Sequence, residues 1–126
     1  MRFMMLMIPN LEPGAEWTPS AEDVATMGRY NDELTKAGIL LALDGLHPIE
    51  KGARVAFEKG GKVSVFDGPF AEAREVIGGY WVIQASSKDE AVQWASRCPS
   101  APGSVIEVRQ VFELEDFPAD VQAAGR

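Results

Sequence analysis

The sequence has little of the chemistry that most metal and cofactor sites require. It holds one cysteine, Cys98, and one histidine, His47, in 126 residues. These two side chains cannot supply a typical zinc site, so we expect no metal. The sequence also contains no Walker phosphate loop, no GxGxxG turn after a strand and no GxSxG elbow. An enzyme built on this chain would therefore work by proton transfer, without a dedicated cofactor.

The single cysteine also bears on the cell compartment. It cannot form an internal disulfide, which favours a reducing environment, and we therefore expect a cytoplasmic protein. Cys98 itself is expected to be a small buried hydrophobe at the end of a helix. A nucleophilic cysteine would need a basic partner, and the adjacent Arg97 does not face it on a helix.

Long hydrophobic runs and clusters of basic residues are absent as well. The first apolar run is about seven residues long and stops at Pro9, which is too short to span a bilayer. It also lacks a small-residue cleavage site, so a buried first strand is the simpler interpretation. The net charge of -7 and the pI of about 4.7 argue against direct binding to nucleic acid. The same acidic surface suits a basic protein partner.

What the chain does contain is an alternation of strand and helix patterns within one expected domain, residues 1–126. Strands are predicted at residues 3–8, 39–48, 53–58, 62–66, 80–86 and 104–114, and helices at about 20–37 and 87–98. Thr18 or Ser20 can cap the first helix, and Ser87 and Glu90 stand at capping-box spacing before the second. The Lys-Gly-Gly between the third and fourth strands predicts a hairpin. Residues from about 113 to 126 are predicted to be an acidic tail or arm.

The order of these elements predicts an α+β fold, an antiparallel sheet with two helices on one face. The first helix has one apolar stripe, formed by Val24, Met27, Tyr30, Leu34 and Ala37. The first, fifth and sixth strands carry apolar residues on both faces. Two helices cover only one side of the sheet, so we expect the open side to pack on a second copy in a homodimer.

The sequence Asp67-Gly68-Pro69-Phe70 is the most distinctive local feature. Gly68 permits backbone angles that other residues resist, and Pro69 fixes the next angle, so the segment predicts a defined corner at a strand end. Asp67 would then project from a rigid support, with Phe70 turned back towards the body. The structural alternative is that the aspartate caps its own turn.

His47 is the only histidine, the side chain best suited to proton transfer near neutral pH, and it ends a predicted strand. The alternative is that His47 is a satisfied core or surface residue without a catalytic role. A carboxylate partner would orient its ring, so we take His47 and Asp67 as the candidate catalytic pair. Substrate contacts are assigned to Arg54, Phe70, Glu72 and Trp81. The alternative is that the charged residues form a solvated loop and that Trp81 belongs to the core. Glu107 and Arg109 share one face of the last strand, where they could pair with each other or meet a ligand or the dimer partner.

Four segments carry a resemblance to a known family. They are "GLHP" from Gly45, "DGPFAEAREVIGGYWVI" from Asp67, "KDEAVQWASRCP" from Lys88 and "SVIEVRQV" from Ser104. Together they resemble the YCII-related family, in its DGPF subgroup, over nearly the whole chain. The resemblance implies a ferredoxin-like fold that forms a dimeric α+β barrel. In the wider family a histidine and an aspartate are proposed as an active-site pair, and the matching positions here are His47 and Asp67.

The resemblance leaves three hypotheses open. The family includes a dehydrochlorinase that acts on a hydroxylated aromatic, which implies a small acid/base enzyme of the lyase or isomerase type. DGPF members are also associated with alternative sigma factors, which implies a non-catalytic ligand-binding or regulatory dimer. The third hypothesis is that the DGPF corner is purely architectural.

Overall fold

The computed structural model describes residues 1–11, 18–68 and 76–125. Its strands are β1 (Arg2–Ile8), β2 (Leu40–Gly45), β3 (Ala53–Phe57), β4 (Val63–Asp67), β5 (Gly79–Gln84) and β6 (Val105–Gln110). Its α-helices are α1 (Ala21–Lys36), α2 (Lys88–Ser96) and α3 (Ala119–Ala124). Three short 3-10 turns join them, η1 (Ile49–Lys51), η2 (Lys59–Gly61) and η3 (Leu114–Asp116).

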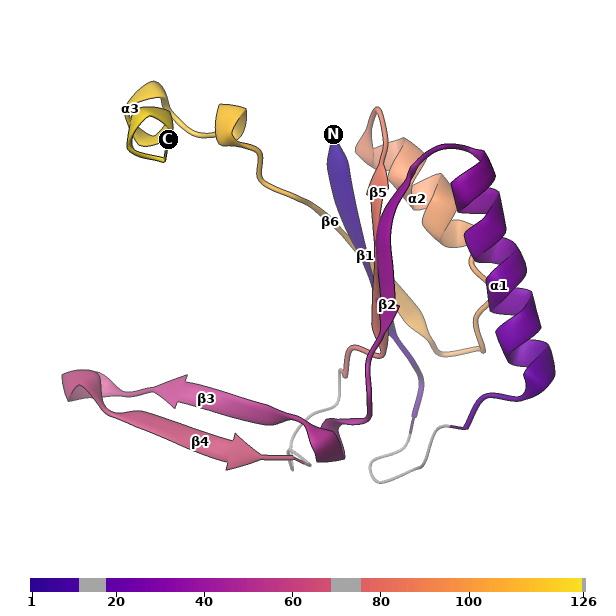
Figure 1. Ribbon diagram of the computed structural model, residues 1–126, viewed down its shortest axis with the longest axis horizontal. Coiled ribbons are helices and arrows are strands. Elements are labelled where there is room, and N and C mark those ends of the chain that lie inside the picture. Colours follow the sequence, from indigo (N-terminus) through magenta and orange to yellow (C-terminus); the bar gives the residue numbers. More distant parts are fainter. Residues whose placement is uncertain (12–17, 69–75, 126) are drawn as a thin grey trace.

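The main sheet has four antiparallel strands in the order β2-β5-β1-β6. If the hairpin β3–β4 is set aside, the chain runs β-α-β-β-α-β, which is the ferredoxin-like order. Helices α1 and α2 both lie on one side of this sheet (Figure 1). The predicted antiparallel α+β arrangement with two helices on one face is therefore confirmed.

The core lies between the sheet and these two helices. The central strands contribute alternate residues, Phe3 and Met5 from β1 and Trp81 and Ile83 from β5, each at most 5% exposed. Helix α1 contributes Tyr30 and Leu34, and α2 contributes Ala91. The Tyr30 hydroxyl donates to the Trp94 carbonyl at 2.7 Å, which ties the two helices together.

The helix ends follow the predicted signals in part. Ser20 caps α1 with a complete capping box, in which Asp23 supplies the returning carboxylate. At α2 only half of the predicted box forms. Ser87 accepts from the Glu90 amide, but the Glu90 carboxylate bonds Ser86 instead. Of the predicted apolar stripe of α1, Tyr30 and Leu34 are buried and Met27 packs against the core, but Val24, at 60% exposed, and Ala37 lie at the surface.

The predicted hairpin is confirmed as β3–β4, joined by η2. Gly60 and Gly61 have φ of 81° and 79°, the left-handed region that glycine adopts without strain. The hairpin is a separate two-stranded sheet that projects from one end of the main sheet, away from the helices (Figure 1).

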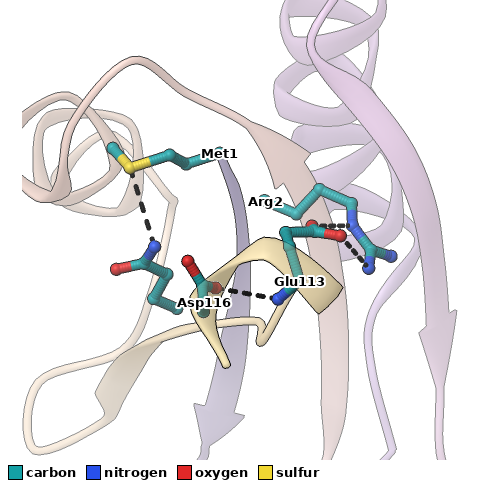
Figure 2. Close-up of polar contacts among 5 residues, drawn as sticks. Met1, Arg2, Glu113 and Asp116 are labelled. Carbon is teal, nitrogen blue, oxygen red and sulfur yellow. Dashed lines mark hydrogen bonds and ion pairs between the residues drawn. The ribbon is translucent and has the colours of Figure 1, made fainter. Parts of the chain in front are cut away.

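The segment predicted as an acidic arm contains η3 and α3, and it also projects away from the helices, at the other end of the sheet (Figure 1). Its first residue is held by the sheet. Arg2 donates from Nε and Nη2 to the two Glu113 carboxylate oxygens, at 2.6 and 3.1 Å (Figure 2). The Glu113 amide in turn donates to Asp116 at 2.8 Å. This bidentate pair fixes where the segment leaves the sheet.

The second face of the main sheet is covered by no element of residues 1–11, 18–68 and 76–125. Register places Met4, Leu6 and Ile8 of β1 and Val82 of β5 on this face, because they alternate with the core residues. We call it the open face. Across the described part of the chain, the helices are too short or too polar to cross a membrane.

Candidate functional site

The two predicted catalytic residues stand on neighbouring corners of the chain. His47 lies two residues beyond β2, and Asp67 is the last residue of β4, opposite Ala53. Both side chains are exposed. Within the described residues neither one makes a hydrogen bond or an ion pair, so the structure does not join them to each other. Their action as a catalytic pair stays a prediction.

The two corners do meet through their backbones. The Gly68 amide donates to the Gly52 carbonyl at 2.9 Å, so the end of β4 is held against the turn that follows His47 and Pro48. A Cβ at position 68 would overlap the Ile49 carbonyl oxygen. Among the described residues, positive φ occurs at other glycines and not at Gly68. The predicted reason for Gly68, its backbone angle, is therefore wrong, and the actual reason is the close approach of another backbone.

The predicted substrate-binding residues are dispersed. Arg54 lies on β3, opposite Phe66. Trp81 is 5% exposed in the core, where its indole N–H donates to Asn31 at 2.8 Å and its ring meets Tyr30 edge-on. This position fits the core alternative, and a ligand contact of Trp81 stays a prediction. Phe70 and Glu72 lie outside the described residues.

The open face holds a polar pair that joins two strands. Register places Asp44 of β2 directly opposite Tyr80 of β5. The Tyr80 hydroxyl donates to Asp44 Oδ2 at 2.9 Å. The hydrogen bond and the negative charge of Asp44 raise the pKa of Tyr80, so the phenol keeps its proton and remains a donor at neutral pH. One carboxylate oxygen of Asp44 is thereby oriented, and the side chain as a whole is exposed.

Across the strands of the open face, from β2 to β6, the side chains change from polar to apolar and back to polar. Next to Tyr80 in the same cross-strand row stands Leu6 of β1, and beyond it Glu107 of β6. The adjoining row runs from Ala42 through Val82 and Met4 to Arg109. Arg109 donates to Glu107 at 3.2 Å, which confirms the prediction that these two side chains share a face and shows that they pair there. An apolar strip thus lies between a Tyr–Asp pair and an Arg–Glu pair.

A comparison with protein-family models matches residues 1–115 of the chain to the YCII-related domain. The chain belongs to the YCII-related family. The predicted family is therefore confirmed over most of the length. A comparison with curated proteins found no match to this YCII-related chain.

One hollow of this YCII-related domain lies away from the open face. It has a volume of about 400 Å³ and is lined by α2, by the chain after it and by β6, with Cys98, Ile106 and Val108 among its walls. Burial raises the pKa of the Cys98 thiol, so the thiol is protonated at neutral pH. Cys98 is partly buried, packs against the core and acts as a hydrophobe, as predicted. Within the described residues, no group of acidic, histidine and cysteine side chains is placed to hold a metal.

The Asp44–Tyr80 pair is the feature that sequence reasoning did not single out. The two residues are 36 positions apart, and a bulge between Leu40 and Ala42 shifts the pairing of β2 with β5. The available signal was that both residues stand on predicted strands of mixed polarity. Without the register, that signal cannot place them opposite each other.

Proposed function

We propose that this YCII-related protein is a homodimeric, cofactor-free acid/base enzyme of the lyase or isomerase type, which acts on a small, partly apolar organic molecule. The observation that carries the proposal is the oriented Asp44–Tyr80 pair beside an apolar strip on the open face. The strip favours binding of an apolar substrate body by burial. The pair offers a proton acceptor and a phenol that remains a donor.

The quaternary part of the proposal follows from the same face. Met4, Leu6, Ile8 and Val82 are half-buried and lie on a strand face that no described element covers, and an uncovered apolar patch of this kind is typical of an interface or a ligand site. A second sheet laid over this patch would exclude water from Asp44 and Tyr80, and exclusion of water strengthens the electrostatic interactions of a proton-transfer site. This is the dimeric barrel that the family resemblance implies. Membership of the DGPF subgroup is part of the proposal, supported by "DGPFAE" and "GGYW".

In this proposal His47 and Asp67 have supporting roles beside the Asp44–Tyr80 pair. Asp44 and His47 are three residues apart, and the amide of Leu46, between them, donates to the carbonyl of Gly78 next to β5. His47 therefore stands at the same end of the sheet as Asp44 and is the candidate for relaying a proton to solvent. Asp67 is the candidate for holding the corner or orienting the imidazole. Following the His47 ring resonances through a pH titration, in the wild type and in Asp67→Asn, separates these two roles.

Hydrogen–deuterium exchange into substrates is the direct test of acid/base activity. A panel of small carbonyl compounds and hydroxylated aromatics is incubated with the protein in deuterated buffer, and the loss of C–H signals is followed by NMR. We expect catalysed exchange for at least one class, reduced about 100-fold or more in Asp44→Asn. Asp89→Asn, an exposed change in the first turn of α2, is the matched control and should leave the rate unchanged.

Chemical-shift mapping of the same panel completes the test. Ligand-induced shifts at Leu6, Tyr80 and Val82 together with exchange would support the enzyme. Shifts at these residues without any exchange would overturn the enzyme in favour of the non-catalytic ligand-binding dimer. Shifts confined to the helix side of the sheet would overturn both.

A further inference from the structure

The hairpin β3–β4 presents an apolar face that nothing in the described chain covers. Val55 lies opposite Val65, and Phe57 lies opposite Val63, so the four side chains share one face. They are between 50% and 82% exposed. An isolated two-stranded hairpin is marginally stable in water, so a hairpin with such a face is expected to pack against something.

The C-terminal segment, residues 112–125, presents a second exposed apolar surface. Phe112 is 70% exposed and stacks on Phe117 with ring centroids 4.8 Å apart. Val121 on α3 is 43% exposed. The segment starts from a fixed point, because Arg2 and Glu113 form the bidentate pair at its root (Figure 2).

The hairpin and the C-terminal segment stand at opposite ends of the main sheet and project towards the same side, the side of the open face (Figure 1). A second copy laid on the open face can be related to the first by a two-fold axis that runs across the strands. Such an axis exchanges the two ends of the sheet. It therefore brings the hairpin of each copy to the C-terminal segment of the other, twice in one dimer.

The charges of the two surfaces are complementary. Residues 113–125 carry four acidic side chains and no basic one, namely Glu113, Glu115, Asp116 and Asp120. The hairpin turn carries Lys59 and Lys62, both exposed, and Lys62 lies 3.9 Å from Glu58 of the same hairpin. The hairpin, residues 53–67, has three basic and two acidic side chains in a chain of net charge -7. Opposite potentials favour the pairing of hairpin with C-terminal segment and disfavour the pairing of two C-terminal segments.

We propose that the hairpin of one copy packs on the C-terminal segment of the second copy, in a reciprocal clasp that closes both ends of the space between the sheets. The inference rests on the homodimer of the proposed function and goes beyond it by naming the two surfaces and their pairing. In this clasp Val55, Phe57, Val63 and Val65 cover Phe112 and Val121 of the other copy. The lysines of the hairpin turn face the acidic residues of that segment.

Cross-linking between chains that carry one cysteine each tests the pairing. In a Cys98→Ser background, Phe57→Cys chains are mixed with differently tagged Val121→Cys chains and treated with a short bis-maleimide. Every product then joins two chains. We expect the mixed product to dominate over Phe57–Phe57 and Val121–Val121 products.

Sedimentation equilibrium of the wild type and of two phenylalanine variants supplies the energetic test. Phe57→Asp should raise the dimer dissociation constant about 100-fold or more, because an apolar contact is lost at both clasps. Phe66→Asp is the matched control, since Phe66 is 53% exposed on the other face of the same hairpin. Its dissociation constant should stay within about threefold of the wild type.

The outcomes separate the clasp from the dimer itself. A wild-type dimer whose cross-links join hairpin to hairpin would overturn the clasp and leave the dimer standing. A dimer equally weakened by Phe57→Asp and Phe66→Asp would also overturn it. A wild-type protein that stays monomeric at every concentration would overturn the dimer of the proposed function together with the clasp.

Discussion

Glycine is required at position 68 because the neighbouring backbone leaves no room for a side chain. Its backbone lies against the 3-10 turn η1, and its amide donates to the carbonyl of Gly52. The Ile49 carbonyl oxygen occupies the place where a side chain would begin. The Asp-Gly corner thus joins the end of β4 to η1 and the residue after it, whatever chemistry Asp67 adds to it.

Substitution of Gly68 by alanine should therefore destabilise the fold. The added methyl group must displace backbone, and overpacking of this kind costs about 1–3 kcal/mol. The free energy of unfolding, measured by urea denaturation, should fall by that amount. Gly28→Ala is the control, because a Cβ there meets nothing within 4 Å in α1, and alanine should stabilise the helix by up to about 1 kcal/mol. A Gly68→Ala protein as stable as the wild type would contradict the close approach.

At the scale of elements, the ion pair between Arg2 and Glu113 joins the root of the C-terminal segment to the main sheet. The hydrogen bonds from Arg2 and its positive charge lower the pKa of Glu113 below its ordinary value of 4.5. A carboxyl group whose pKa is lowered by folding contributes its stabilisation above the unfolded value, and that contribution is lost as the pH falls through the folded value. Acid should therefore release η3 and α3 before it unfolds the main sheet.

This release can be followed by NMR of the amides of residues 113–125 between about pH 6 and pH 3. We expect their shifts to move towards disordered values below about pH 4.5, while the amides of β1 and β5 stay unchanged. Glu113→Gln should loosen the segment already at neutral pH. Glu115→Gln, an exposed neighbour whose side chain forms no ion pair in the described chain, should not. Simultaneous loss of the segment and the sheet would contradict this local role.

At the scale of the whole molecule, the open face makes stability depend on association. A dimer that buries Leu6 and Val82 links unfolding to dissociation, so the melting temperature rises with protein concentration. Leu6→Lys would place a charge in that interface without touching the core between the sheet and the helices. Its melting temperature should be lower and should not depend on concentration.

Calorimetry or circular dichroism over a hundredfold range of concentration, about 1 to 100 μM, distinguishes these cases. Val24→Lys, an exposed change on α1, is the control and should keep the dependence of the wild type. A wild-type melting temperature that is the same at all concentrations would contradict a dimer formed through the open face.

The sequence by itself determined the local elements and the class of fold. Short runs apolar on both faces marked β1, β5 and β6, Thr18 or Ser20 marked the start of α1, and Lys-Gly-Gly marked the hairpin, because each of these signals is contained in a short window of the chain. The tertiary structure decided which residues meet: Tyr80 with Asp44, Arg2 with Glu113, and Gly68 with the backbone of Ile49. These contacts join positions 36, 111 and 19 residues apart. They depend on strand register and on the direction in which the hairpin leaves the sheet, and no local pattern encodes either.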